Sequence, residues 1–315
     1  MSLQNVPSKI GVVGARGRLG AIILRILERL DGVDAIAIET LPDGLDAVIN
    51  TAPLQGADLH RLALKSNCHV VDVTIDGSLI REIIALHSLA QQQARCLIAM
   101  AGLAPGLTGL LARKMLTSTP NADKVQVSLL QNSSGTAGRQ GALDMVNLLT
   151  DPMCIYKSRP YPNRHGKDLS TRKMFDFYTP ELEFMVEANE IDFVTGFNNR
   201  YMNSAMATMA VVRRLSPPIF RWIRDAVADA KARTSDATAE EIELGAVVFN
   251  SEDKVIADRL VRLVSDYGAT AAVACAAATL AVKGLSHTGV GHLCDFFELD
   301  AILEHPLVQG QLCES

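Results

Sequence analysis

A chain of 315 residues is long enough to bury a substantial core and to form about two domains. Hydrophobic residues make up 48% of it and charged residues 21%, as in ordinary globular proteins, and the formal net charge is -5. This acidic balance argues against nucleic acid as a partner, because domains that bind nucleic acids carry a basic surface. A small-molecule substrate is therefore expected.

The cysteine pattern and the most apolar stretch bear on the compartment. The six cysteines include no Cys-x-x-Cys pair, and the N-terminus does not resemble a signal peptide. Reduced thiols and a cytoplasmic location are expected. Residues 269–282 are too few to span a bilayer, which needs roughly 20 apolar residues. We expect a buried helix there and no membrane association.

Strand and helix patterns alternate through the first third of the chain. Short apolar runs bounded by polar residues predict strands, and apolar residues at helical spacing predict the helices between them. The expected strands cover residues 9–13, 34–39, 46–50, 69–73 and 95–100, and the expected helices cover residues 21–30, 58–66, 79–94 and 107–116. This alternation predicts a parallel sheet covered on both faces.

The pattern changes after Pro120. Longer strands are expected at residues 124–131, 190–197 and 243–250, without regular helical crossovers. Residues 152–173, rich in proline, arginine and lysine, are expected to form a surface loop or lid, and residues 228–240 a polar helix or linker. These features predict a second domain of mixed α+β type.

Three glycines lie between the first expected strand and the first expected helix. Gly14, Gly17 and Gly20 form the pattern G-x-x-G-x-x-G. Such glycines permit a tight turn, let backbone N–H groups approach a pyrophosphate at a helix N-terminus, and let helix and strand pack closely. A glycine turn kept only for packing is the alternative. In its strand and helix context, the motif predicts a Rossmann-type unit that binds NAD or NADP.

The predicted fold class is therefore α/β. It comprises an N-terminal Rossmann-type parallel sheet, a second mixed α+β domain, and a C-terminal helix that returns to the first domain. The expected domains are residues 1–120 for the dinucleotide, residues 121–268 for substrate binding and dimerisation, and residues 269–315 as a helical segment packing on the first domain. A homodimer formed through the sheet of the second domain is expected.

Charged residues near the glycine turn point to different dinucleotides. Glu39 ends the second expected strand, where a carboxylate can accept hydrogen bonds from the ribose hydroxyls of NAD. Arg16 and Arg18 could instead pair with the 2′-phosphate of NADP. The sequence leaves NAD and NADP open, and a solvated carboxylate at a strand end is the alternative for Glu39.

Three loops follow expected strands at the carboxyl edge of the sheet, where open parallel sheets bind ligands. They cover residues 50–53, 72–74 and 101–106. The third, a glycine-proline loop that opens a helix, could frame the nicotinamide, with an ordinary strand-to-helix turn as its alternative. The residues expected to bind the cofactor are Gly14, Arg16, Gly17, Arg18, Leu19, Gly20, Glu39, Thr51, Ala52, Pro53, Thr74, Gly102 and Leu103.

The second domain offers candidates for binding a substrate carboxylate. Ser134, Thr136 and Arg139 lie in a segment that follows a strand and opens a helix, which suits an anion, although a capping loop explains the segment almost as well. Arg200 and Tyr201 lie in a second segment of this kind. Arg200 is expected to bind the substrate, and Tyr201 is expected to be catalytic.

Proton transfer calls for a group that titrates near neutral pH. His165 and Lys167, in the basic loop, are the catalytic candidates, because imidazole titrates near neutral pH and a lid could carry it over a substrate. A solvated loop histidine is the alternative. A structural role is expected for His287 and His292, and the spacing of Cys, His and carboxylate residues gives no metal site.

Several segments resemble the saccharopine dehydrogenase-like family. They are residues 70–74 with the helix after them, residues 101–112, and the C-terminal run from 269 through 290 with the acidic helix after it. The resemblance covers about half of the chain. It implies a Rossmann domain, an inserted substrate domain with a mixed sheet, and pyridine-nucleotide hydride transfer at a carbon bonded to nitrogen.

The leading hypothesis is an NAD(P)-dependent oxidoreductase acting on an amino-acid-like or imine substrate. Only residues 40–45 separate Glu39 from the next expected strand, so part of the usual nucleotide-binding half is missing or shortened. This favours, as an alternative, a non-catalytic Rossmann-type binding protein with a degenerate nucleotide pocket. A lyase or epimerase that recycles its hydride is a third possibility.

Overall fold

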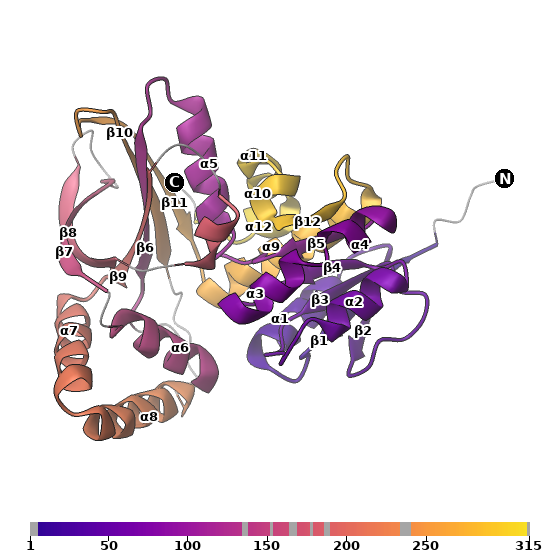
Figure 1. The fold of residues 1–315 in the computed structure, drawn as a ribbon, viewed down its shortest axis with the longest axis horizontal. Coiled ribbons are helices and arrows are strands. Elements are labelled where there is room, and N and C mark those ends of the chain that lie inside the picture. Colours follow the sequence, from indigo (N-terminus) through magenta and orange to yellow (C-terminus); the bar gives the residue numbers. More distant parts are fainter. Residues whose placement is uncertain are drawn as a thin grey trace. The chain divides into compact units, whose positions relative to one another are not determined.

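The computed structural model describes residues 6–133, 138–151, 154–163, 169–176, 179–185, 190–233 and 241–313. Contacts divide the chain into two compact units, each drawn from separated stretches of sequence (Figure 1). Unit 1 comprises Met1–Leu110, Pro180–Val186 and Tyr267–Gln311, and unit 2 comprises Leu111–Thr179, Glu187–Asp266 and Leu312–Ser315. The 3-10 helix η1 (Pro180–Glu183) therefore belongs to unit 1, although the sequence analysis assigned it to the second domain.

Unit 1 is built on a six-stranded sheet of order β12-β5-β4-β3-β1-β2, in which every neighbouring pair is parallel. Consecutive residues such as Val48 and Ile49 are both fully buried, so the sheet is covered on both faces. The strands are β1 (Ser8–Val13), β2 (Val33–Ile38), β3 (Ala47–Asn50), β4 (His69–Asp72), β5 (Cys96–Ala99) and β12 (Gly289–His292).

Helices cover this sheet. The helices α2 (Asp58–Lys65), α3 (Gly77–Ile84) and α4 (His87–Gln92) share one hydrophobic core with the strands. The helix α9 (Asp266–Lys283) is rich in buried alanine, and its Cys275 contacts the backbone of Ile23 in α1 (Arg18–Leu27). Small side chains let such a helix pack closely. The remaining helices of this end are α10 (Leu293–Phe296), α11 (Leu299–Leu303) and α12 (Pro306–Gln309).

Unit 2 contains a mixed sheet of order β11-β10-β6-β9-β8-β7, in which β6 and β9 are parallel and the other neighbours antiparallel. The strands are β6 (Lys124–Gln131), β7 (Tyr156–Tyr161), β8 (Ser170–Asp176), β9 (Glu190–Phe197), β10 (Ile242–Phe249) and β11 (Val255–Leu263). The helices α6 (Arg139–Leu149), α7 (Arg200–Leu215) and α8 (Pro217–Arg233) share a core cluster with Phe175 of β8. The helix α5 (Leu107–Ser118) begins in unit 1 and ends in unit 2.

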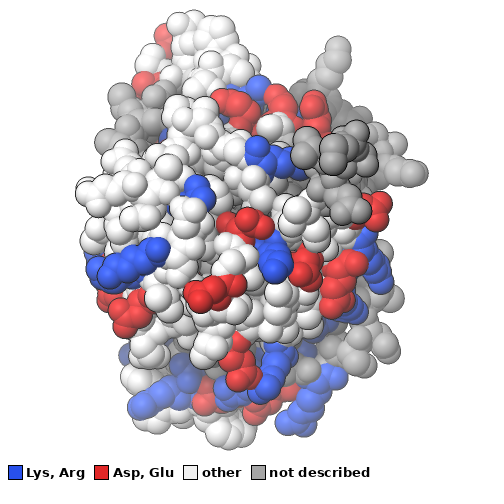
Figure 2. Space-filling model, turned by 90° about the vertical axis from the view of Figure 1, so that its right-hand side faces the viewer, with Lys and Arg blue, Asp and Glu red and all other residues white. Residues whose placement is uncertain are grey.

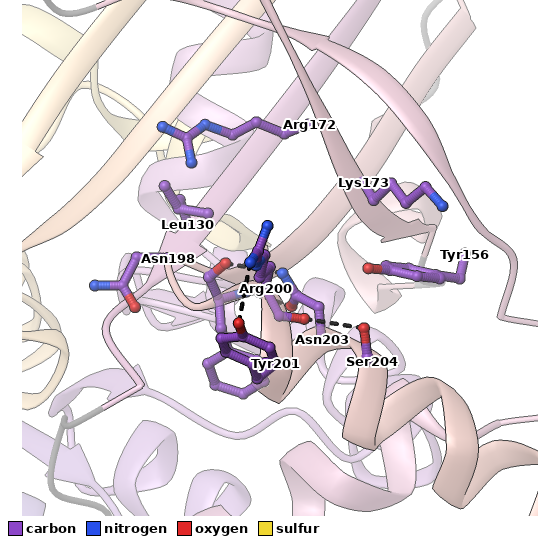
Figure 3. Close-up of a pocket in the computed structure, with 10 residues that line it drawn as sticks. Leu130, Tyr156, Arg172, Lys173, Asn198, Arg200, Tyr201, Asn203 and Ser204 are labelled. Carbon is purple, nitrogen blue, oxygen red and sulfur yellow. Dashed lines mark hydrogen bonds between the residues drawn. The ribbon is translucent and has the colours of Figure 1, made fainter.

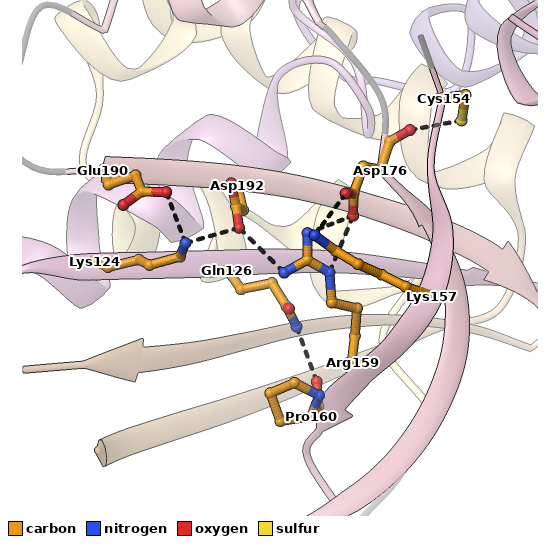
Figure 4. Close-up of polar contacts among 9 residues, drawn as sticks. All are labelled: Lys124, Gln126, Cys154, Lys157, Arg159, Pro160, Asp176, Glu190 and Asp192. Carbon is orange, nitrogen blue, oxygen red and sulfur yellow. Dashed lines mark hydrogen bonds and ion pairs between the residues drawn. The ribbon is translucent and has the colours of Figure 1, made fainter. Parts of the chain in front are cut away.

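The basic stretch expected as a surface loop contains two strands instead. Residues 156–161 and 170–176 form β7 and β8, which pair from Tyr156 with Phe175 to Tyr161 with Ser170. Arg159 lies on this sheet because Asp176 and Asp192 pair with its guanidinium (Figure 4). Carboxylates from other strands thus make a charged sequence suitable for a sheet. The loop prediction is wrong for these residues.

Smaller differences have local causes. The helix expected at residues 79–94 is two helices, because the chain turns at Ala85 and Leu86, which lets the ring of His87 hydrogen-bond to the backbone of Val290 in β12. Within residues 228–240, Ala228 to Arg233 complete α8 and the rest lie outside the described residues. The strands β11 and β12 and the part of α8 before Ala228 were not expected.

The second sheet is irregular where β8 meets β9. The strand β8 pairs with β9 only at Phe175 and Asp176, whereas it pairs with β7 along six residues. The first part of β8, which carries Arg172 and Lys173, is therefore not paired with β9. An opening is left beside the ends of β6 and β9.

The fold also bears on surface charge, membrane-spanning helices and metal-binding groups. On the face drawn in Figure 2, acidic and basic side chains are interspersed. Among the described helices, none combines the length and apolar character needed to cross a membrane. Within the same residues, no group of three or more His, Cys, Asp or Glu side chains is placed to hold a metal ion.

Candidate functional site

The glycine turn connects β1 to α1 at the carboxyl edge of the parallel sheet. Gly14 has φ +80, a backbone conformation that L side chains rarely adopt. A methyl group on Gly14 would lie 2.6 Å from Thr51 Oγ1, and one on Gly20 would overlap the carbonyl of Gly14. The Gly17 N–H donates to Gly14 O at 2.8 Å and closes the turn. These positions require glycine for the strand, turn and helix to pack this closely.

The turn also presents the N-terminus of α1 without a side-chain cap. Gly17 is the N-cap residue and has no side chain to accept a hydrogen bond from the first amides, and the first turn of α1 holds no acidic residue. Uncapped amides at a helix N-terminus carry a partial positive charge and favour an anion. The geometry therefore suits a phosphate group at Gly14, Gly17, Arg18, Leu19 and Gly20.

The two groups expected to distinguish NAD from NADP contact each other. Arg16 Nη2 lies 2.7 Å from Glu39 Oε1, and the side chains are 93% and 75% exposed. Exposed ion pairs contribute little and open readily. Arg18 instead lies over the ring of Tyr267, with 5.6 Å between its Cζ and the ring centroid. The strand β2 is the edge of the sheet, as the short segment after Glu39 suggested.

A buried polar network holds the loops after β3 and β4. Asp72 is fully buried and accepts hydrogen bonds from Asn50 Nδ2 at 2.8 Å and from the Thr74 N–H at 2.6 Å. His60 Nε2, also fully buried, contacts the same carboxylate. Thr51 Oγ1 donates to Val13 O at 2.8 Å. Thr51 and Ala52 therefore lie beside the glycine turn, next to Gly14, and Pro53 follows them in the sequence. Thr74 is fixed by Asp72 at the end of β4.

The loop at residues 101–106 closes against the protein itself. The Gly102 N–H donates to Pro105 O, and the Leu103 N–H donates to Thr270 Oγ1 at 3.3 Å. Leu103 is fully buried, so its side chain is part of the core. The loop therefore packs on α9 through its own backbone.

The N-terminus of α5, which this loop opens, already holds a carboxylate. Glu181 accepts hydrogen bonds from the Gly106 and Gly109 N–H groups at 2.7 and 2.9 Å and from Thr108 Oγ1. It is 1% exposed and lies 3.1 Å from His292 Nε2. The Cys294 N–H donates to His292 Nδ1, so Nε2 carries the proton that faces Glu181. His292 is thus a structural residue, and Glu181 takes the place of an external anion.

Four of the predicted site residues lie outside the described residues. They are Ser134, Thr136, His165 and Lys167. Arg139 begins α6 and its Nε pairs with Asp229 Oδ1 at 2.7 Å, which raises the pKa of the guanidinium. Arg139 is thus engaged with a carboxylate of α8 in this structure.

Arg200 and Tyr201, by contrast, line a cavity of about 430 Å³ in unit 2 (Figure 3). Arg200 Nη2 donates to Tyr201 Oη at 3.0 Å, and Tyr201 is 70% exposed. Asn199 caps α7 by accepting from the Tyr201 N–H and so sets the direction of both side chains. The residues lining the cavity are Leu130, Tyr156, Arg172, Lys173, Phe197, Asn198, Arg200, Tyr201, Asn203 and Ser204.

Sequence reasoning missed two of the cations in this cavity, Arg172 and Lys173. They lie on β8, within the stretch predicted to be a loop, where basic residues suggested only solvent exposure. Residues 170–176 read Ser-Thr-Arg-Lys-Met-Phe-Asp, without the alternation of polar and apolar residues that indicates a strand, so no periodic signal could have found it. Tyr156 also lines the cavity, and burial raises the pKa of its hydroxyl, so this hydroxyl stays protonated.

Comparison with known proteins shows the fold. No protein-family model and no curated protein matches the chain. A multiply substituted meso-dapdh from Clostridium tetani E88, solved with DAP, has a TM-score of 0.50 and 11% identity, covering 94% of this chain and 96% of that chain. C. glutamicum DAP dehydrogenase in complex with DAP gives a TM-score of 0.49 at 10% identity, covering 96% and 98%.

A third solved structure, an engineered D-amino acid dehydrogenase bound to NADP+, gives a TM-score of 0.46 at 13% identity, covering 96% of this chain and 98% of that chain. At such identities the likeness concerns the fold. The predicted fold class, a parallel Rossmann-type sheet with a second mixed domain, is confirmed. The resemblance to the saccharopine dehydrogenase-like family stays a prediction.

Proposed function

We propose that the chain is an NAD(P)-dependent oxidoreductase that transfers hydride at a carbon bonded to nitrogen in an amino-acid-like or imine substrate. The observation that carries the proposal is the turn between β1 and α1, where Gly14 and Gly20 leave no room for side chains and no side chain caps α1. Such a turn suits the pyrophosphate of a dinucleotide. The solved structures of similar fold include DAP dehydrogenases and an engineered D-amino acid dehydrogenase.

The residues of the chain would have separate tasks. The turn and the loops at Thr51 and Thr74 would bind and orient the dinucleotide, whose nicotinamide supplies or accepts the hydride when bound. Arg200 would grip a substrate carboxylate. The Tyr201 hydroxyl accepts a hydrogen bond from Arg200, which leaves its own proton to be donated, so Tyr201 is our candidate for moving one proton. His165 and Lys167 remain alternative proton carriers. A saccharopine dehydrogenase-like reaction is the finer form of this proposal.

The test replaces Gly17, whose φ of -74 any residue can adopt. Gly17→Asp should cap α1, because aspartate is a preferred N-cap residue, and stabilise the protein by roughly a few tenths of a kcal/mol or leave its stability unchanged. The added carboxylate should repel the pyrophosphate and weaken NADPH or NADH binding at least about tenfold. Cofactor fluorescence measures the binding, and thermal unfolding measures the stability.

Gly17→Asn is the matched control, because it has the same shape and capping ability without the charge. A methyl group at this position would lie 3.2 Å from Gly14 O, so both variants need the same small adjustment. Asparagine should bind the dinucleotide more tightly than aspartate does. Equal binding by the two variants, or no binding of either dinucleotide to the unaltered protein at millimolar concentration, would contradict the proposal.

A second candidate function is a non-catalytic Rossmann-type binding protein. The observation that favours it is the contact between Arg16 and Glu39, which occupies the groups that would read the adenosine ribose, at the edge strand of the sheet. Assays of hydride transfer distinguish the oxidoreductase from the binding protein. If the protein binds ADP-ribose but transfers no hydride to any imine, the result supports the binding protein. Exchange of a deuterium label without net NADH change would instead indicate a lyase or epimerase that recycles its hydride.

We also propose a homodimer formed through the sheet of unit 2. The strand β11 is an edge of that sheet, and its residues Val255 and Ile256 are exposed apolar side chains. Exposed edges of this kind invite pairing. Light scattering after size exclusion tests it, and a monomer at micromolar concentration would reject it.

A further inference from the structure

The cavity in unit 2 gathers three positive charges from two separate segments of the chain. Arg172 and Lys173 come from β8, and Arg200 comes from the first turn of α7 (Figure 3). Among the described residues that line the cavity, none is acidic. The described lining residues therefore carry three positive charges and no negative charge.

These cations are held by aromatic rings. The Cζ atoms of Arg172 and Arg200 lie 4.9 Å from the ring centroids of Tyr161 and Tyr201, and Lys173 Nζ lies 6.0 Å from that of Tyr156. A ring face orients a cation without itself occupying its N–H donors, whereas a carboxylate would use them. At Arg200 one further contact is made, from Nη2 to Tyr201 Oη. The side chains are thus positioned while their charge stays available to a ligand.

Other cations of the same sheet are instead paired with carboxylates. Arg159 contacts both Asp176 and Asp192, Lys157 lies 3.2 Å from Asp176, and Lys124 pairs with Glu190 and Asp192 (Figure 4). Carboxylates thus neutralise these charges of the same sheet. The contrast separates cations that stabilise the sheet from those that face the cavity.

Arg172 gives the strongest indication of a missing ligand. Its Nε atom is buried and has no hydrogen-bond partner in the described part of the chain. An unsatisfied buried donor on a charged group is costly, so its retention calls for an explanation. An anion in the cavity would supply the missing acceptor.

We propose that this cavity is a binding site for a small organic molecule that carries two negative charges, either a dicarboxylate or a phosphate monoester. Arginine forks recognise carboxylate and phosphate oxygens alike. The volume of about 430 Å³ exceeds the space of one anionic group, and Leu130 and Phe197 offer apolar surface to the body of the molecule. Because the cavity contains Arg200, the inference rests on the substrate-binding part of the proposed function and names its substrate class. Binding can be tested without dinucleotide, because the described lining residues all belong to unit 2.

The experiment measures binding to the full-length protein by calorimetry without dinucleotide. The probes are dicarboxylates of two to six carbons, glycerol phosphate, and the monocarboxylate propionate. A dianion should bind at least about tenfold more tightly than propionate, and its affinity should fall with added salt. The better class of probe decides between carboxylate and phosphate. Binding of no dianion more tightly than propionate would overturn the proposal.

Two variants make the test specific. Arg172→Met should weaken dianion binding at least about tenfold and should not lower the melting temperature, because it removes a buried donor that has no partner among the described residues. Lys157→Met is the matched control: it removes one positive charge from the neighbouring strand β7, where Lys157 pairs with Asp176 outside the cavity, and should leave binding within about twofold. Equal losses in the two variants, or a destabilised Arg172→Met that still binds, would reject the site. Failure of NADPH binding would leave this result unaffected.

Discussion

At the scale of single residues, the sequence predicted which charged residues belong to the candidate sites better than it predicted the residues that they contact. Arg16 and Glu39 were both expected at the nucleotide, one favouring NADP and the other NAD, and they contact each other. Arg200 was recognisable because it comes after a strand and opens a helix. Arg172 was missed, because its role depends on a cavity that forms only where β8 separates from β9. Residues distant in sequence determine such a role.

The contact between Arg16 and Glu39 leads to a prediction about cofactor preference. Glu39→Gln should free the guanidinium for a 2′-phosphate and remove a carboxylate that would repel it. The ratio of NADPH to NADH affinity should therefore rise several-fold, as measured by fluorescence titration. Asp34→Asn, which removes an exposed carboxylate from the same strand β2, should leave the ratio unchanged. A falling ratio in Glu39→Gln would show that Glu39 does not face the adenosine ribose.

At the scale of elements, local periodicity predicted the first sheet well. The expected strands and helices of the first hundred residues appear within a few positions, because each is a buried apolar run or an amphipathic stripe. The strand β12 could not be expected: its four residues, Gly289 to His292, contain two glycines and one histidine and form a strand only by pairing with β5. The strands β7 and β8 were not predicted for a related reason: the charges of Lys157 and Arg159 are neutralised by Asp176 and Asp192, which lie farther along the chain.

The N-terminus of α5 gives the prediction at this scale. Glu181→Gln should destabilise the protein by about 2–4 kcal/mol, because buried N–H donors that now face a carboxylate would meet an amide with only one acceptor oxygen. Urea unfolding measures the change. Glu298→Gln is the control: Glu298 precedes α11 but is exposed and caps no amide of that helix, so its loss should change stability by less than about 0.5 kcal/mol. Similar effects in both variants would mean that the Glu181 contacts contribute little.

At the scale of the whole molecule, composition predicted two domains but not how the chain is shared between them. Unit 1 takes residues from the beginning, the middle and the end of the sequence. The middle piece, Pro180–Val186, is short and supplies Glu181, the carboxylate at the N-terminus of α5. The sequence alone does not show which of several carboxylates has this role. Boundaries drawn along the chain at residues 120 and 268 therefore differ from the division by contacts, which falls inside α5 and next to Tyr267.

Stability of the whole protein should depend on pH through His69. Burial lowers the pKa of His69 to about 4, assisted by Arg95, and the Cys96 N–H donates to its Nδ1. Between about pH 6.5 and 4, His69 is protonated in the unfolded chain but stays neutral in the folded protein. The free energy of unfolding therefore falls as the pH drops through this range. The slope from this group is at most about 1.4 kcal/mol per pH unit.

Urea unfolding at several pH values checks this dependence. His69→Gln, which keeps an acceptor near Cys96, should make the acid side of the curve flatter. His87→Gln replaces a histidine whose ring is also hydrogen-bonded to backbone, through Val290, and serves as the comparison. An unchanged curve for His69→Gln would assign the acid sensitivity to other groups.

The division of unit 1 has a consequence for how the protein is made. The strand β1, the glycine turn and α1 are synthesised long before α9, which packs on α1, and before β12, which pairs with β5. Glu181 emerges between them. Unit 1 can therefore complete its native core only after these later segments have been translated, and until then some of its apolar strands lack their final partners.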